Sequence, residues 1–178
     1  TPLDSYHDFN KESKAKKLTE LLKQGKNIAL VSDAGTPGIS DPGFYLIRLA
    51  RQEGQKITAI PGPCAAINAL VLSNMPCDKF MFLGYLSVKP GKKKKQILSV
   101  KDFDSSVIIY ESCHKAKKTV QAILETLGNI NISVSRELTK IYEEVFTKTA
   151  EEWLAYWGDG EIKGELVLIF VPYFMARG

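Results

Sequence analysis

The sequence predicts an α/β protein with two domains, and three observations lead to this prediction. Over the first 77 residues, short apolar runs alternate with helix-like segments, which is typical of a parallel sheet covered by helices. The β-like runs 131–138 and 142–149 are separated by only three residues, which forces an antiparallel pair. With 44% hydrophobic residues in a chain of 178, there is enough apolar material for one sizeable core or two small ones.

We therefore expect a partial N-terminal α/β domain over residues 1–77, with a parallel sheet, and a C-terminal α/β domain with a mixed sheet over residues 78–178. In the first domain, apolar runs bounded by turn residues predict buried parallel strands, and cap residues mark where helices start and end. The predicted elements are a helix between Asn10 and Gly25, a strand at 27–32, a helix from Asp41 (N-cap) and Pro42 to Gly54, a strand at 56–60 and a helix from Pro63 through Leu70.

The second domain is expected to hold five strands, one longer helix and one short helix. Glycine at position 128 ends the longer helix, and Thr149 with Glu152 has the spacing of a capping box for the short helix, which carries Trp153 and Trp157. The predicted elements are strands at 80–86, 105–112, 131–138, 142–149 and 165–172, and helices at 116–127 and after Thr149.

A single basic segment accounts for the positive charge of the chain. The net charge is +4, and residues 89–101, which we expect to form a loop, hold six lysines and no acidic residue, so the rest of the chain sums to −2. Lysines in a mobile loop can neutralise phosphates of a nucleic acid, although such runs are usually only solvated surface. The candidates for RNA contacts are Lys92, Lys93, Lys94 and Lys95.

Other features of the sequence favour a cytoplasmic protein without a metal. No apolar run approaches the 18 or so residues of a membrane span, and the polar residues 1–10 do not have the pattern of a signal peptide. The three cysteines, Cys64, Cys77 and Cys113, lie far apart in the sequence and show no zinc-ligand spacing with histidine, so we expect reduced thiols.

Two glycine-bearing loops are the strongest sign of a ligand site. The loops 32–41 and 61–66 both follow predicted parallel strands and both precede helices, and ligands of α/β sheets bind beyond the carboxyl ends of strands. The alternative is that glycine and proline only form tight turns there. Neither loop is a P-loop, because no Gly-Lys-Ser/Thr follows, and neither has the Gly-x-Gly-x-x-Gly pattern.

Five ordered motifs resemble those of one enzyme family over nearly the whole chain. They are SDAGTPGISDPG (32–43), IPGPCAAINAL (60–70), YESCHK (110–115), SRELTKIYEE (135–144) and KGELVL (163–168). The chain resembles the ribosomal RNA small subunit methyltransferase I family of the tetrapyrrole methylase superfamily, the class III S-adenosylmethionine-dependent methyltransferases. This resemblance implies two α/β domains with the cofactor in the cleft between them, usually in a homodimer. It also implies methylation of a cytidine ribose 2′-hydroxyl in 16S rRNA of the small ribosomal subunit.

The chain also departs from the pattern of that family. A GTPIGNL-like glycine-rich loop and a CEDTR-like segment are absent, so we expect an N-terminally truncated form whose cofactor site lacks one wall and which binds the cofactor weakly on its own. Cys113 and Lys115 stand where the family usually reads ESPHR, and Cys64 stands where serine is common. A cysteine keeps the size of serine, so a contact made by the backbone at position 64 can persist.

The resemblance and the loops together give the candidate site residues. For the cofactor they are Asp33, Ala34, Gly35, Thr36 and Pro37 from the first loop, and Gly62, Cys64 and Ala65 from the second. The alternative for Asp33 is that its side chain caps its own turn. For catalysis they are Glu111, Arg136, Glu137 and Lys140, of which none is singled out as the general base. The alternative is that Arg136 and Glu137 pair with each other or with Lys140.

Two rival functions remain open at this point. The same fold could methylate a carbon of a tetrapyrrole or corrin, although those relatives carry a GDP-type loop in place of SDAGTPG. The expected truncation also allows a non-catalytic module that binds RNA or assists assembly.

Overall fold

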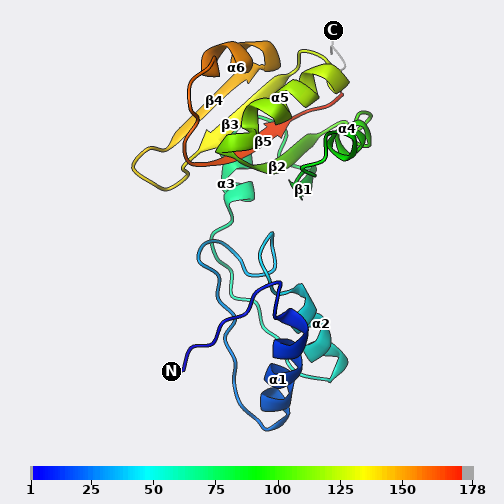
Figure 1. Cartoon of the computed structure of the whole chain (residues 1–178), viewed down its shortest axis with the longest axis vertical. Coiled ribbons are helices and arrows are strands. Elements are labelled where there is room, and N and C mark those ends of the chain that lie inside the picture. Colours follow the sequence, from blue (N-terminus) through cyan, green and yellow to red (C-terminus); the bar gives the residue numbers. More distant parts are fainter. Residues whose placement is uncertain (1, 174–178) are drawn as a thin grey trace. The chain divides into compact units, whose positions relative to one another are not determined.

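The computed structural model describes residues 2–173, and its contacts divide the chain into two compact units, Thr1–Cys64 and Ala65–Gly178 (Figure 1). The division falls before helix α3 (Ala65–Leu72), which packs on strands β2, β3 and β5 of the second unit. The boundary that the sequence predicts, after residue 77, places this helix in the first domain instead.

The first unit is built on two helices that pack on each other, α1 (Lys11–Lys23) and α2 (Phe44–Gln52). Ala15 of α1 and Leu46 and Ala50 of α2 are buried, as expected for amphipathic helices. The predicted start of α2 is wrong by two residues, since Gly43 rather than Asp41 occupies the N-cap position.

The parallel sheet predicted for the first domain is not present among residues 2–64. Segments 27–32 and 56–60 are not strands, and each leaves a large apolar side chain in solvent, with Val31 76% and Ile60 86% exposed. A strand needs a hydrogen-bonded neighbour, and a sheet of fewer than three strands is marginal in water. Two apolar runs alone therefore do not make a sheet, even though each has the composition of a buried strand.

The second unit contains a five-stranded mixed sheet in the order β1-β2-β5-β3-β4, which confirms the prediction for this part of the chain. Strand β1 pairs with β2 in parallel, and the other three pairs are antiparallel, including the predicted pair of β3 and β4. The strands are β1 (Phe80–Tyr85), β2 (Ser106–Ser112), β3 (Asn131–Arg136), β4 (Glu144–Thr149) and β5 (Glu165–Phe170).

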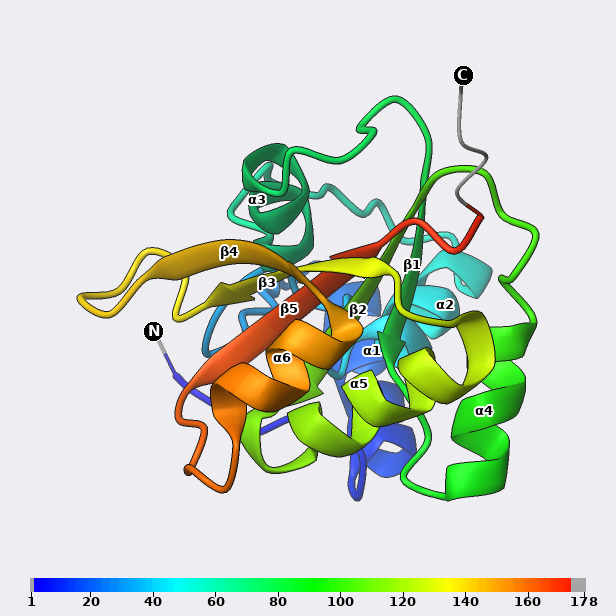
Figure 2. The same cartoon turned by 90° about the horizontal axis from the view of Figure 1, so that it is seen from above.

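Helices cover both faces of this sheet. Figure 2 shows α3 on one face and α4 (Pro90–Leu98), α5 (Cys113–Leu127) and α6 (Ala150–Trp157) on the other. On the face with three helices, fully buried Val107, Ile109 and Ile123 form the centre of the core with Trp153, whose indole Nε1 donates a hydrogen bond to Ile132 O at 2.7 Å. The predicted capping box of Thr149 and Glu152 at the start of α6 is confirmed.

The predicted loop over residues 89–101 is wrong, because most of it forms helix α4. Pro90 occupies the first turn, where its missing N–H and fixed φ suit a helix, and four consecutive lysines have good helix propensity. Lys93 and Ile97, which are four residues apart, are both buried and fix one side of the helix against the rest of the unit.

Candidate functional site

The two glycine-bearing loops contact each other within the first unit. The hydroxyl of Thr36 donates a hydrogen bond to the carbonyl oxygen of Pro63 at 3.2 Å. A Cβ placed on Gly35 would lie 3.9 Å from the same carbonyl oxygen. Loop 32–41 and the start of loop 61–66 therefore lie side by side, as expected if both contribute to one site.

The first loop is shaped by left-handed backbone and by a serine. Gly35 and Gly38 have φ of +75° and +87°, a region that residues with a side chain rarely adopt. The hydroxyl of Ser32 donates to the carbonyl oxygens of Ala34 at 3.0 Å and Gly35 at 3.3 Å. Asp33 is exposed, and its carboxylate accepts no hydrogen bond from any residue between 2 and 173, so Ser32 rather than Asp33 holds the turn.

Backbone in both loops is open to a ligand. Ala34, Gly35 and Gly62 are exposed, and within residues 2–173 the N–H groups of Ala34 and Gly35 have no acceptor. A Cβ on Gly62 would meet nothing closer than Ile60 O at 3.9 Å. Cys64 is half-buried, Pro37 is half-buried, and Ala65 is the exposed first residue of α3. The loops thus offer uncharged peptide donors and acceptors, with the exposed carboxylate of Asp33 beside them.

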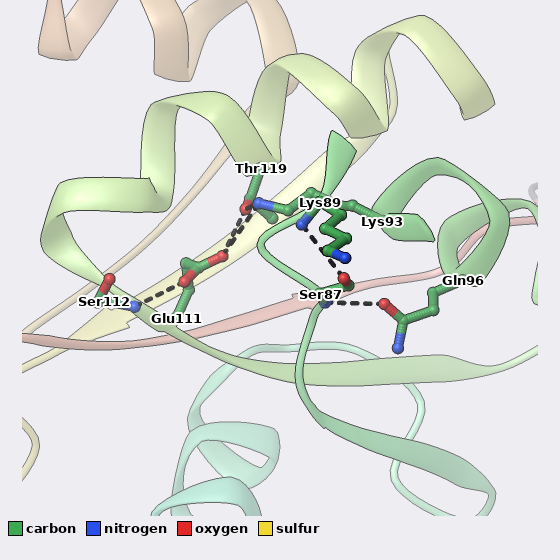
Figure 3. A network of polar contacts seen from close by, with 7 residues as sticks. All are labelled: Ser87, Lys89, Lys93, Gln96, Glu111, Ser112 and Thr119. Atoms are coloured by element: carbon green, nitrogen blue, oxygen red, sulfur yellow. Dashed lines mark hydrogen bonds and ion pairs between the residues drawn. The ribbon is translucent and has the colours of Figure 1, made fainter. Parts of the chain in front are cut away.

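Glu111, a candidate catalytic residue, lies inside the second unit (Figure 3). It is 3% exposed, and its Oε1 accepts a hydrogen bond from Ser112 N at 2.9 Å. Its Oε2 accepts from the hydroxyl of Thr119 and lies 3.6 Å from the ammonium of Lys93, which itself donates to Thr119 Oγ1 at 2.5 Å. A general base must reach the substrate hydroxyl, so this burial argues against that role for Glu111.

The same network changes the interpretation of the four lysines. Lys93 is 6% exposed and its ammonium is directed into the core, which argues against a contact with phosphate. Lys94 pairs with Glu125 of α5 at 2.5 Å. Lys92 and Lys95 are exposed and form no ion pair with another residue between 2 and 173, so these two remain the candidates for RNA contacts. No local signal in the sequence connects Lys93 with Thr119, which lies 26 residues further on.

Glu137 and Lys140 belong to a second network at the end of β3. The Oε1 of Glu137 accepts a hydrogen bond from Glu165 N at 2.8 Å and from the ammonium of Lys140 at 3.0 Å. Lys140 also contacts Glu165 Oε2 at 3.0 Å. The backbone hydrogen bond from Glu165 is the main reason that the pKa of Glu137 is lowered, and the pKa of Lys140 is raised by its two carboxylate partners. Glu137 is therefore a weak proton acceptor.

Arg136 forms a bidentate ion pair across the β3–β4 ladder. Its Nε lies 3.0 Å from Glu144 Oε2 and its Nη2 lies 3.0 Å from Glu144 Oε1. Hydrogen bonding between the two groups raises the pKa of Arg136 and lowers the pKa of Glu144. Glu144 is not among the partners that the sequence suggests for Arg136, because the two residues face each other only once the register of the two strands is known.

Comparison with known proteins places the chain in a family of methylases. The sequence profile of the family Tetrapyrrole (Corrin/Porphyrin) Methylases matches residues 2–153, and the chain belongs to that family. Within the family, the chain is similar to the Ribosomal RNA small subunit methyltransferase I of Bacillus subtilis (strain 168), with 43% identity over 169 residues. It is 42% identical over 170 residues to the protein of the same name from Mycoplasmopsis pulmonis (strain UAB CTIP). The resemblance inferred from the five motifs is thereby confirmed.

The extent of these matches differs between the relatives. The aligned residues are 95% of this chain in both cases, but 58% of the Bacillus subtilis protein and 75% of the Mycoplasmopsis pulmonis protein. The chain thus spans about three fifths of the length of the first relative.

Solved structures support the same fold. The methyltransferase CobJ superposes with a TM-score of 0.68 at 18% identity, covering 99% of this chain and 77% of that chain. A uroporphyrin-III C-methyl transferase from Thermus thermophilus, complexed with S-adenyl homocysteine, gives a TM-score of 0.61 at 11% identity, covering 91% of this chain and 73% of that chain. At such identities the likeness establishes the fold alone. Between residues 2 and 173, no helix is both long and apolar enough to cross a membrane.

Proposed function

We propose that the protein is an S-adenosylmethionine-dependent methyltransferase that methylates the ribose 2′-hydroxyl of a cytidine in 16S rRNA of the small ribosomal subunit. The observation that carries this proposal is the contact between loops 32–41 and 61–66, made by Thr36 and Pro63. It occurs in a chain of the methylase family whose relatives at about 40% identity are named for methylation of small-subunit ribosomal RNA. The solved tetrapyrrole and corrin enzymes share less than 20% identity and do not favour their own substrates for this chain.

The chemistry of the loops fits S-adenosylmethionine. This cofactor supplies a methyl group that is already activated on a positively charged sulfonium. Exposed N–H groups of Ala34 and Gly35 suit the oxygen and nitrogen acceptors of a nucleoside and an amino acid, and Gly62 lets a ligand approach the backbone closely. The exposed carboxylate of Asp33 complements positive charge. Thr36, Pro37, Cys64 and Ala65 complete the proposed set of cofactor contacts.

The contribution of the protein to the reaction is mainly alignment and exclusion of water. Donor and acceptor atoms that are held in line about 3 Å apart gain several kcal/mol over the reaction in solution. Glu111 is buried and Glu137 is held by hydrogen bonds that lower its pKa, so we propose neither as the general base. We propose that Arg136 and Lys140, which are both paired with carboxylates, orient groups on the substrate side and do not accept a proton.

The RNA substrate is proposed to contact helix α4 through Lys92 and Lys95. Each lysine that neutralises a phosphate of a single strand releases a counterion and adds about −0.7 to the slope of log K against log salt. As the family resemblance implies, we also propose a cytoplasmic homodimer, which the molar mass measured by light scattering would test.

Methyl transfer can be tested on a hybrid enzyme. In this hybrid, the chain replaces the matched 169 residues of the Bacillus subtilis relative, and small ribosomal subunits are supplied with S-adenosylmethionine labelled on the methyl group. We expect label in 2′-O-methylcytidine after digestion of the RNA. Label on a base, or transfer only to a porphyrin-type acceptor, would contradict the proposal.

A further inference from the structure

A cavity of about 430 Å³ lies in the second unit, where β3 and β4 meet α6 and the segment that follows it. This volume is within the range of pockets that bind small molecules. The two glycine-bearing loops do not line it. Its principal lining residues are Arg136, Glu144, Phe146, Trp153, Tyr156 and Trp157.

Four aromatic side chains line the cavity, and two of them face solvent. Trp153 is buried, and its ring centroid lies 4.9 Å from that of Trp157 and 5.7 Å from that of Tyr156, so the three rings support one another. Tyr156 is 60% exposed and Phe146 is 50% exposed. Rigid rings that remain partly in water provide a surface on which a planar apolar group gains contact at little cost in side-chain entropy.

The polar part of the wall is a fixed and neutralised guanidinium. Glu144 holds Arg136 through two hydrogen bonds of 3.0 Å, which fixes the plane of the guanidinium and balances its charge. At the rim, Lys163 lies 3.8 Å from Glu161, which again balances the charge. The charges of the lining residues therefore balance, and a further cation, the ammonium of Lys148, lies 5.1 Å from the ring centroid of Tyr156. A neutral planar ring can stack on the aromatic side chains and on the guanidinium.

We propose that this cavity binds an unpaired nucleobase of the RNA substrate. This inference rests on the proposed function, which supplies the RNA. Proteins that bind single-stranded RNA combine lysines that contact the backbone with aromatic and arginine planes on which splayed bases stack. The second unit carries both features, the exposed lysines of α4 and the aromatic cavity.

Intrinsic fluorescence offers a direct test, because the chain contains only two tryptophans and both line the cavity. The complete chain is titrated with a short single-stranded oligoribonucleotide and, separately, with an abasic oligonucleotide of the same length. We expect the first to quench tryptophan emission at saturation and the second to bind through its phosphates without quenching. Quenching by both to the same extent would overturn the proposal.

Variants distinguish the contribution of the base to binding from that of the phosphates. We expect Tyr156→Ala to weaken binding of the base-containing oligonucleotide roughly 5- to 100-fold, with an unchanged salt slope, and Tyr156→Phe to retain the affinity. Tyr142→Ala removes a tyrosine that is 69% exposed and outside the cavity, so it should bind like the wild type. A double variant, Lys92→Ala with Lys95→Ala, should instead reduce the salt slope and preserve quenching at saturation. Urea unfolding of each variant checks that the fold is intact.

The outcomes distinguish this inference from the proposed function. If the oligoribonucleotide binds with a steep salt dependence while Tyr156→Ala binds like the wild type, the base-binding cavity is refuted and the RNA substrate is not. If neither oligonucleotide binds at low salt, the RNA substrate is refuted, and the cavity proposal with it.

Discussion

Lys93→Met should destabilise the protein far more than substitution of an exposed lysine does, although Lys93 belongs to a run of four lysines. The ammonium of Lys93 lies within a buried network with Thr119 and Glu111 (Figure 3), and Glu111 is 3% exposed. Removing one partner of a buried ion pair leaves an uncompensated charge and typically costs about 3–5 kcal/mol. Glu111 keeps two hydrogen bonds, from Ser112 N and Thr119 Oγ1, which partly compensate its charge. We therefore expect a loss of about 3 kcal/mol in the free energy of unfolding, at the lower end of that range.

The assay is urea unfolding followed by tryptophan fluorescence, because both tryptophans belong to α6 of the second unit. With an m value of about 2 kcal/mol/M, a loss of about 3 kcal/mol lowers the midpoint by roughly 1.5 M. Lys92→Met is the matched control, since Lys92 is the exposed neighbour in the same helix, and its effect should stay within about 0.5 kcal/mol.

A second substitution tests the cause of the effect. In the double variant Lys93→Met with Glu111→Gln, no buried charge remains, so about 1–3 kcal/mol of the loss should be recovered relative to the sum of the single changes. If Lys93→Met costs no more than Lys92→Met, then the Lys93 side chain reaches solvent and the buried network described above is refuted.

Four further predictions concern single positions. Gly62→Ala should leave the urea midpoint unchanged, because a Cβ there meets nothing closer than 3.9 Å. The same change should weaken binding of S-adenosylhomocysteine in a calorimetric or NMR titration, whereas the control Gly91→Ala should leave binding unchanged. Gly43→Ala should speed hydrogen exchange of the α2 amides and destabilise the first unit by about 1–3 kcal/mol, because its Cβ would lie 3.1 Å from a neighbouring backbone nitrogen and a side-chain carbon. The arginine partner of Glu144 lowers the pKa of this carboxyl group, so its stabilising effect is present above the ordinary value of 4.5 and is lost as pH falls through the lowered value. Between pH 5 and pH 3, roughly the window of carboxylate titration, the urea midpoint of Glu144→Gln should therefore fall less than that of the wild type. Thr149→Ala removes the capping box of α6 and should cost about 1 kcal/mol in the same assay.

The sheet of the second unit could be predicted because its strands carry their own signals. Runs such as 106–112 and 165–170 are apolar and bounded by turn residues, and the short connection between β3 and β4 permits only an antiparallel pair. The strand order could not be predicted, since β5, the last strand in the sequence, lies between β2 and β3. Such a placement depends on long-range pairing that leaves no local pattern.

The errors arose where tertiary context decides the outcome. Runs 27–32 and 56–60 have strand composition, but a ladder depends on neighbours that a local pattern does not contain. The charge of the lysine run predicts a loop, whereas its helix propensity and the proline at position 90 favour α4. Only the fold shows that Lys93 is directed inward.

The candidate site was predicted unevenly for a similar reason. The contact between the glycine-bearing loops is seen in the hydrogen bond from Thr36 to Pro63, although the parallel strands from which it was predicted do not form. The partners of Arg136 and Glu111 depend on strand register and on helix packing, which composition and spacing do not specify. The cofactor contacts at both loops remain predictions.

An NMR titration tests the shared cofactor site most directly, because chemical shifts report weak binding residue by residue. ¹⁵N-labelled protein is titrated with S-adenosylhomocysteine, and the amide signals of both loops are followed. The account predicts that Ala34, Gly35, Thr36, Gly62 and Cys64 shift together along one binding curve. Shifts at only one loop, or none at either while amides elsewhere respond, would contradict it.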